Sequence, residues 1–311
     1  MNKKVVVVMG GTSTEAEVSR RTGTAILEAL KSKGYNAEGL ELDPANFARQ
    51  IKESNCDIVF NAVHGKYGED GVLQGTLDLL GIPYTGSGVL ASAITMDKAA
   101  SKRVFAAEGI STPRFKTYYK YEMNRDLATE IEKEFSLPCV VKASSQGSSI
   151  GVHIVEKREE LEGALADSFS YNDEVLIEEF VTGRELTVAV WGDAEHKEAF
   201  PIIEITTNSG RYDYESKYTV GASQHIIPAR ISAEDTKKVQ DMAIKTVTAC
   251  GCVGVARVDM MLSDEGVPYV FEVNSVPGMT ATSLVPDAGR AMGIEFPELC
   301  EHILKLAGFT K

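Results

Sequence analysis

No stretch of this sequence is apolar for the roughly 18 residues that a membrane-spanning helix needs. The run Val5–Met9 is likewise too short for the core of a signal peptide. Two glycine-rich nucleotide signatures are missing as well. Without G-x-G-x-x-G the sequence is not typical of a dinucleotide-dependent oxidoreductase, and without G-x-x-x-x-G-K-[ST] it has no Walker A loop.

Basic residues and cysteines are also few. There are 32 Lys and Arg against 45 Asp and Glu, and the formal net charge of −13 argues against general binding to nucleic acids or anionic membranes. A local basic pocket for a nucleotide is still compatible with this balance. The five cysteines are odd in number, and Cys250 and Cys252 form C-x-C rather than a C-x-x-C motif. We expect reduced thiols that fill core positions in a cytoplasmic protein.

The stretch richest in chemistry is 257–284, which reads RVDMMLSDEGVPYVFEVNSVPGMTATSL. Two runs with strand character, Val253–Leu262 and Val267–Val273, flank the polar, glycine-containing segment 263–266. This pattern predicts a β-hairpin.

Four polar side chains gather on this hairpin. Side chains two apart in a strand point the same way, so Arg257 and Asp259 share one face, as do Glu272 and Asn274. In the simplest register Asp259 lies near Glu272 and Asn274. Carboxylate and amide oxygens suit Mg²⁺, and a guanidinium suits a carboxylate or phosphate. The alternative is a solvated hairpin face, which the apolar neighbours of these residues disfavour.

Strands alternate with helices in the first third of the chain. Val5–Met9 and Asp57–Val63 read as buried strands, which predicts a parallel, doubly wound sheet with ligands beyond the carboxyl ends of its strands. The loops after these strands contain Glu15 and His64. Glu15 is either a first-turn acid that suits the helix dipole or an anchor for a substrate amine. His64 is either an ordinary loop residue or part of a site.

The middle of the chain suggests a phosphate-binding loop. Asp97 is expected to cap a helix that begins at Lys98. Further on, the strand 137–143 carries Lys142 and runs into the small-residue loop 144–151. Such a loop exposes N–H groups to phosphate oxygens, with a lysine charge at its root. The alternative is a flexible hairpin loop.

Two later segments are also informative. Val175–Val181 predicts a strand in which Glu178 and Phe180 share a face, either to hold an adenine and its ribose or as a solvated polar face. The polar segment Thr207–Ser223 is long for a loop inside a compact domain. Its tyrosines and lysines favour a lid that closes over a site rather than plain disorder.

Taken in order, these pieces resemble the D-alanine–D-alanine ligase family of the ATP-grasp superfamily, over nearly the whole length. The motifs in the first half are Gly10-Gly11-Thr12-Ser13 with Glu15 and Val18-Ser19, His64-Gly65 with Gly68-Glu69-Asp70-Gly71, Tyr84-Thr85-Gly86-Ser87-Gly88, Asp97-Lys98, and Gly147-Ser148-Ser149 with Gly151. Those in the second half are Tyr214 with Lys217-Tyr218, Arg257 with Asp259, Glu272-Val273-Asn274 with Pro277-Gly278-Met279, and Ser283-Leu284-Val285-Pro286.

The resemblance implies an α/β protein with the ATP-grasp fold. It implies an N-terminal doubly wound parallel-sheet domain at 1–96, a small central α+β domain at 97–185, and a C-terminal α+β domain at 186–311 with the metal site and lid. In this family ATP phosphorylates the carboxylate of one D-alanine, and the amine of a second attacks the acyl phosphate and expels phosphate, for peptidoglycan synthesis. ATP, two Mg²⁺ ions with Mn²⁺ as an alternative, and a cytoplasmic homodimer with no nucleic-acid or membrane partner are also implied.

The resemblance assigns roles to particular residues. The metal ligands would be Asp259, Glu272 and Asn274. The phosphates of ATP would contact Lys98, Lys142 and Lys217. The adenine and ribose would contact Glu178, Phe180, the backbone of Val181, and Glu185. The substrate residues would be Glu15, His64, Arg257, Ser283 and the N–H of Leu284. The catalytic groups would be a hydrogen-bonded triad of Glu15, Ser148 and Tyr218, and an oxyanion hole of Arg257 with the N–H of Gly278.

Two other functions are compatible with parts of the pattern. One is an ATP-grasp ligase with another acceptor, such as D-lactate or D-serine. Tyr218 favours an amine acceptor, because the D-lactate members of the family lack this tyrosine. The other is a catalytically silent nucleotide-binding or sensor protein, which the intact set of Arg257, Asp259, Glu272 and Asn274 disfavours.

Overall fold

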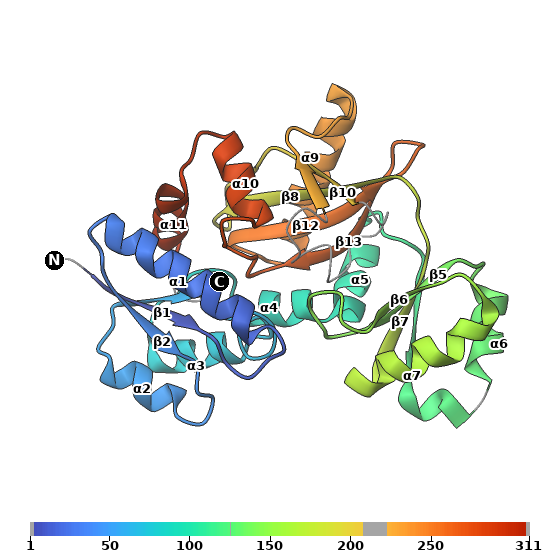
Figure 1. Cartoon of the computed structure of the whole chain (residues 1–311), viewed down its shortest axis with the longest axis horizontal. Helices are drawn as coiled ribbons and strands as arrows, with labels where there is room; N and C mark the ends of the chain where they lie inside the picture. The colour runs from blue at the N-terminus through green and yellow to red at the C-terminus, as the bar shows by residue number, and fades with distance from the viewer. Residues whose placement is uncertain (1–2, 125, 208–222, 309–311) are drawn as a thin grey trace.

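The computed structural model describes residues 3–124, 126–207 and 223–308. Figure 1 shows three parts, each built around its own sheet, with the N-terminal part in blue, the central part in green and the C-terminal part in orange and red. Most of the expected lid, including Lys217 and Tyr218, lies outside the described residues. In the part of the chain that is described, no helix combines the length and the apolar character needed to cross a membrane.

The N-terminal part contains a parallel sheet with the strand order β2-β1-β3. Its elements are β1 (Lys4–Met9), α1 (Ala16–Ser32), β2 (Asn36–Glu41), α2 (Phe47–Glu53), β3 (Ile58–Asn61) and α3 (Val72–Leu80). Alternate valines of β1 point to opposite faces: Val5 and Val7 share a core with α1, and Val6 and Val8 share one with α2 and α3. The predicted doubly wound sheet is therefore confirmed.

One strand of this sheet has no hydrophobic signal. β2 reads NAEGLE, and Ala37 is its only buried residue. As an edge strand it pairs with β1 alone among the described residues. The backbone hydrogen bonds of β1 hold it in place, which a hydrophobic pattern cannot reveal.

Two helices connect the N-terminal part to the rest. α4 (Val89–Met96) and α5 (Lys98–Ala107) run from the blue part toward the green part beneath the C-terminal sheet (Figure 1). Asp97 caps α5, since its Oδ1 accepts a hydrogen bond of 2.8 Å from the backbone N–H of Ala100. The predicted helix start at Lys98 is thus confirmed.

The central part is a four-stranded antiparallel sheet with the order β4-β7-β5-β6. Its elements are β4 (Phe115–Tyr119), α6 (Leu127–Glu134), β5 (Cys139–Ala143), β6 (Val152–Val155), α7 (Leu161–Tyr171) and β7 (Glu174–Glu179), with 3₁₀ turns at Lys120–Asn124 and Arg158–Glu160. α6 and α7 cover one face. The strand expected over Val175–Val181 ends early, because β7 stops at Glu179. Phe180 lies beyond the strand and is 38% exposed, whereas Glu178 is 1% exposed, so the expected shared strand face is wrong.

The C-terminal part is an antiparallel sheet with the order β11-β10-β8-β12-β13, and β9 pairs with β8. Its elements are β8 (Arg184–Gly192), β9 (Lys197–Ala199), β10 (Ile203–Thr207), β11 (Ser223–Ile226), α9 (Ala233–Ala249), β12 (Gly254–Leu262), β13 (Pro268–Asn274), α10 (Leu284–Ala291) and α11 (Phe296–Lys305). α9 covers one face. On the other face, α10 and α11 share a single core with α1 and the N-terminal sheet.

His64 links the N-terminal part to the C-terminal part. Its Nδ1 lies 3.1 Å from the carbonyl oxygen of Val276, and its Nε2 lies 3.0 Å from the hydroxyl of Thr22. A carbonyl oxygen only accepts, so Nδ1 carries the hydrogen and Nε2 accepts from Thr22. Burial lowers the pKa of His64 to about 4 and the cation of Arg257 acts in the same direction, although the bond to Val276 opposes them. The imidazole is therefore neutral at pH 7.

We predict that His64 makes the fold acid-sensitive between pH 6.5 and 4. In the unfolded chain His64 has an ordinary pKa of 6.5, whereas in the folded chain its pKa is about 4. Between these two pH values the unfolded chain therefore binds a proton at His64 that the folded chain does not. The stabilisation is therefore complete above pH 6.5 and is lost as the pH falls toward 4, by about 3 kcal/mol at most. His64→Asn keeps a donor toward Val276 but does not titrate. Urea unfolding from pH 4 to 7 should give a flatter pH dependence for this variant, and parallel curves would contradict the role of His64.

Candidate active site

The predicted hairpin is confirmed, with its polar side chains on one face. β12 and β13 pair so that Asp259 lies opposite Glu272 and Arg257 opposite Asn274, with an irregularity after Asp259. The guanidinium of Arg257 donates to both oxygens of Asp259, from Nε at 2.8 Å and from Nη2 at 2.7 Å. Thr187 of β8 donates to Oδ1 at 2.6 Å and Asn274 donates to Oδ2 at 3.1 Å. Asp259 therefore accepts hydrogen bonds from three side chains.

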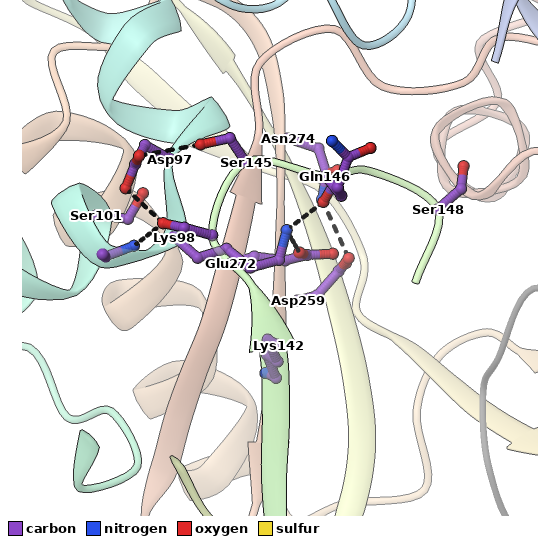
Figure 2. Close-up of polar contacts among 12 residues, drawn as sticks. Asp97, Lys98, Ser101, Lys142, Ser145, Gln146, Ser148, Asp259, Glu272 and Asn274 are labelled. Atoms are coloured by element: carbon purple, nitrogen blue, oxygen red, sulfur yellow. Dashed lines mark hydrogen bonds and ion pairs between the residues drawn. The ribbon is translucent and has the colours of Figure 1, made fainter. Parts of the chain in front are cut away.

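The hairpin has the donor chemistry of a magnesium site. Figure 2 shows Asp259, Glu272 and Asn274 converging beside Lys98. Among the described residues, no three His, Cys, Asp or Glu side chains form a metal-binding group. The chain thus offers two carboxylates and one amide, which fits Mg²⁺, because this ion usually takes one or two carboxylates and completes its shell with waters and phosphates. Since Arg257 holds both oxygens of Asp259, the guanidinium has to give way for that carboxylate to bind a cation.

The start of α5 is tied to the loop 144–151. Lys98 lies 3.4 Å from Oε2 of Glu272 and donates a 2.6 Å hydrogen bond to the carbonyl oxygen of Gln146. Asp97 accepts from the hydroxyls of Ser144 and Ser145, each at 3.0 Å. The contact with Ser145 is drawn in Figure 2. The cap of α5 therefore also fixes the root of the predicted phosphate loop.

A buried ion cluster joins α5, β5 and β7. Glu178 is 1% exposed, and its two oxygens each lie 2.7 Å from an ammonium group, Oε1 from Lys102 and Oε2 from Lys142. Burial by itself raises the pKa of Glu178, but the two lysines outweigh it and hold that pKa below its usual value. Glu178 is thus a carboxylate at neutral pH. Lys102 was not among the predicted site residues, because a lysine in an amphipathic helix carries no signal of burial.

The N-terminal and central parts meet at a polar cavity of about 140 Å³. Ser148 donates a hydrogen bond to Oε1 of Glu15 across this boundary. A Cβ at Gly147 would lie 2.4 Å from Oε2 of Glu15, and one at Gly65 would lie 2.8 Å from it, so only glycine permits this approach. Two members of the predicted triad are therefore together, and the third, Tyr218, lies outside the described residues.

Glu69 is a further acid in this cavity, present in the motif but not predicted as a site residue. Its Oε2 accepts a 2.7 Å hydrogen bond from the backbone N–H of Gly65. Burial raises the pKa of Glu69 to about 8, and the neighbouring charge of Glu15 adds to the effect. At neutral pH Glu69 is therefore protonated and can donate a hydrogen bond, whereas Glu15 accepts one.

The far end of the cavity is formed by the start of α10. Ser283 immediately precedes the helix and Leu284 is its first residue. The Ser283 oxygen accepts a 3.0 Å hydrogen bond from the backbone N–H of Thr280. The first N–H groups of a helix have no partner inside it, so this end suits a carboxylate.

The cavity brings together all five residues predicted to bind substrate. Its walls include Glu15, His64, Ser148, Arg257, Glu272, Asn274, Gly278, Ser283 and Leu284. Both ring nitrogens of His64 are bonded within the chain. Of the residues predicted to bind the nucleotide, Lys142 and Glu178 are in contact, whereas Phe180 is 38% exposed and Val181 and Glu185 are half-buried.

Comparison with known proteins accounts for nearly the whole chain. A family model described as the D-ala D-ala ligase N-terminus matches residues 38–87, and one described as the D-ala D-ala ligase C-terminus matches residues 104–305. The D-alanine–D-alanine ligase of Pelotomaculum thermopropionicum is 47% identical over 311 residues, covering 99% of this chain and 97% of that protein. The ligase of the same name from Desulforudis audaxviator is 46% identical over 308 residues, with 99% of each chain covered.

Two solved structures extend the likeness to the fold. The D-alanine–D-alanine ligase of Bacillus anthracis complexed with ATP matches with a TM-score of 0.85 and 35% identity, over 98% of this chain and 97% of that one. The VanG D-Ala:D-Ser ligase of Enterococcus faecalis matches with a TM-score of 0.83 and 30% identity, over 98% and 99%. With both family models matched and relatives aligned almost end to end, the chain belongs to the D-alanine–D-alanine ligase family, and its fold is that of the ATP-grasp enzymes.

Proposed function

We propose that the protein joins two D-alanine molecules into D-alanyl-D-alanine, with ATP converted to ADP and phosphate, to supply peptidoglycan precursors in the cytoplasm. One observation carries this proposal. The cavity lined by Arg257, Glu272 and Asn274 of the hairpin also contains the Glu15–Ser148 pair, so a phosphate-handling group and an amine-binding acid share one space. Such a space suits a carboxylate that is first phosphorylated and then attacked by an amine.

ATP occupies the cleft between the central sheet and the β12–β13 hairpin in this proposal. Lys98, Lys142 and Lys217 contact the phosphates. The adenine and ribose lie against Glu178, Phe180, the backbone of Val181 and Glu185. The ionised Glu178 supports this placement, since a carboxylate accepts hydrogen from an amino group such as that of adenine.

Asp259, Glu272 and Asn274 would hold two Mg²⁺ ions, with Mn²⁺ as a substitute. When bound, such ions neutralise the charge that develops on a transferred phosphoryl group. The chain's own contribution is to set three oxygen donors next to Lys98 and Arg257. On release of Asp259 the guanidinium would turn toward the substrate.

The substrate side divides into a donor end and an acceptor end. Glu15 would bind the ammonium of the first D-alanine, and His64 would lie beside it. Arg257 and the N–H of Gly278 would stabilise the oxyanion of the tetrahedral intermediate. At the acceptor end, Ser283 and the N–H of Leu284 would hold the carboxylate of the second D-alanine.

The lid segment and its tyrosine bear on the choice of acceptor. Tyr218 would complete a triad with Glu15 and Ser148 and so favour an amine over a hydroxyl nucleophile. The likeness to a D-Ala:D-Ser ligase makes D-serine the second candidate acceptor, and D-lactate is a further alternative. A homodimer, bound only to small-molecule substrates, completes the proposal.

The proposed reaction predicts that ADP release depends on D-alanine. With ATP and Mg²⁺, the protein should release ADP and phosphate in step with formation of the dipeptide. A coupled ADP assay with a panel of D- and L-amino acids and D-lactate measures this. Folded protein that releases no additional ADP when D-alanine is added would refute the ligase, and a higher rate with D-serine would reassign the acceptor.

Arg257→Ala should lower kcat by about 10²–10³-fold, the scale of one oxyanion-hole donor. Because the guanidinium has to release Asp259 before a cation binds there, its removal should lower the Mg²⁺ concentration for half-maximal activity or leave it unchanged, and should not raise it. Arg230→Ala is the matched control, since Arg230 is exposed and pairs with Glu204 away from the cavity. Turnover like that of the unaltered protein would remove Arg257 from the oxyanion hole.

Glu272→Gln should raise the Mg²⁺ concentration for half-maximal activity by at least about tenfold, because a neutral amide replaces one of two carboxylates. Glu265→Gln, in the exposed turn of the same hairpin, should leave the Mg²⁺ requirement unchanged. Titration of activity with MgCl₂ at saturating ATP distinguishes the two variants. Equal Mg²⁺ curves for both would argue against a metal at Glu272.

A further inference from the structure

Lys102 and Lys142 bind the same carboxylate in different ways. The side chain of Lys102 is completely buried, and three oxygens surround its ammonium: Oε1 of Glu178 at 2.7 Å, the hydroxyl of Thr112, and the carbonyl oxygen of Val270 at 3.2 Å. Its hydrogen bonds go to Thr112 and Val270, and the ion pair with Glu178 adds a third contact. Lys102 is therefore fixed in place.

Lys142 is held less completely. Its ammonium lies 2.7 Å from Oε2 of Glu178 and 5.2 Å from the centre of the Phe271 ring, and its side chain is 12% exposed. A ring face attracts a cation but takes no defined hydrogen. Of the two lysines, only Lys142 can turn toward a ligand without abandoning several hydrogen bonds.

Glu178 cannot be left without a cation. Its side chain is 1% exposed, and a buried charge that loses its partner is strongly destabilising. If Lys142 turns to the phosphates of ATP, Lys102 is the cation that stays.

We propose that Lys102 is a positioning residue that keeps Glu178 ionised and fixed while Lys142 serves the ATP phosphates, and that it thereby sets the preference for a 6-aminopurine. This inference rests on the proposed placement of adenine beside Glu178. An ionised carboxylate only accepts hydrogen, so it favours the 6-amino group of adenine and repels the 6-oxo group of hypoxanthine or guanine. Lys102 never touches the base and acts through Glu178.

Hydrogen bonds between the segment after α5 and β13 bring Lys102 close to Glu178. Thr112 donates a 2.7 Å hydrogen bond to the same Val270 carbonyl that Lys102 contacts, and Ser111 accepts one of 2.8 Å from the N–H of Val270. The chain after α5 is thereby fastened to β13, and Glu178 comes from β7 of the central sheet. Lys102 thus contacts both β13, through the carbonyl of Val270, and β7, through Glu178.

The test is equilibrium binding of ATP and ITP, which carries a 6-oxo group, to the full chain with Mg²⁺ by calorimetry. This readout needs no D-alanine and no turnover, so it is independent of whether the ligase reaction occurs. For Lys102→Met, the Kd for ATP should rise by at least about tenfold while the Kd for ITP changes by less than about threefold, so the preference for ATP collapses. Equal weakening of both nucleotides, unchanged ATP binding, or no preference in the unaltered protein would each overturn the proposal.

Arg103→Met is the matched control. Arg103 is the next residue of α5 and also pairs with an acid of β7, Glu174, at 2.6 Å, but its side chain is 53% exposed. Its loss removes a helix-to-strand ion pair without touching Glu178, so the ATP-to-ITP ratio should not change. A shift of the ratio in this variant as large as that in Lys102→Met would also contradict the proposal.

A double variant covers the case in which Lys102→Met does not fold. Lys102→Met with Glu178→Gln leaves no unpaired buried charge from this pair. If Lys102 acts only through Glu178, the double variant should bind ATP and ITP as Glu178→Gln alone does, within about twofold. Clearly weaker ATP binding by the double variant would show a separate role for Lys102 and overturn the inference.

Discussion

The site depends above all on the register between β12 and β13. Side chains alternate along a strand, so a slip of one residue would carry Glu272 and Asn274 to the opposite face from Arg257 and Asp259. β12 is paired on both sides, with β8 along its whole length and with β13. The same pairing places Thr187 of β8 opposite Asp259. Register is therefore set by three strands together, and the acid receives its hydrogen-bond donors from all three.

The sequence predicts this fold well where the determining forces are local. The β12–β13 hairpin follows from alternation around a glycine-containing turn, and the start of α5 follows from the capping oxygen of Asp97. It predicts poorly where neighbours decide the structure. β2 is polar and exists because β1 offers it hydrogen bonds. The pattern 175–181 predicts a strand that includes Phe180, but β7 ends at Glu179 and Phe180 is 38% exposed.

In the candidate site too, contacts between distant parts of the chain are harder to predict from the sequence than local structure. Glu15 and Ser148 are 133 positions apart, and residue patterns alone do not show that two separate sheets bring them together. The family resemblance did predict the pair, because it carries information about how the parts pack. It did not predict Thr187, Glu69 or Lys102 as site residues. Each of these looks like an ordinary strand, loop or helix position until burial gives it partners.

The core shared by α1, α10 and α11 has a consequence for how the chain is made. Ile26 and Leu30 of α1 pack in one cluster with Ile303 and Leu304 of α11. Figure 1 shows α1 and α11 on the same side of the N-terminal part. One face of the N-terminal sheet is therefore covered by helices that follow it far along the chain. During translation that apolar face stays uncovered until α10 and α11 emerge, which exposes the nascent chain to chaperones.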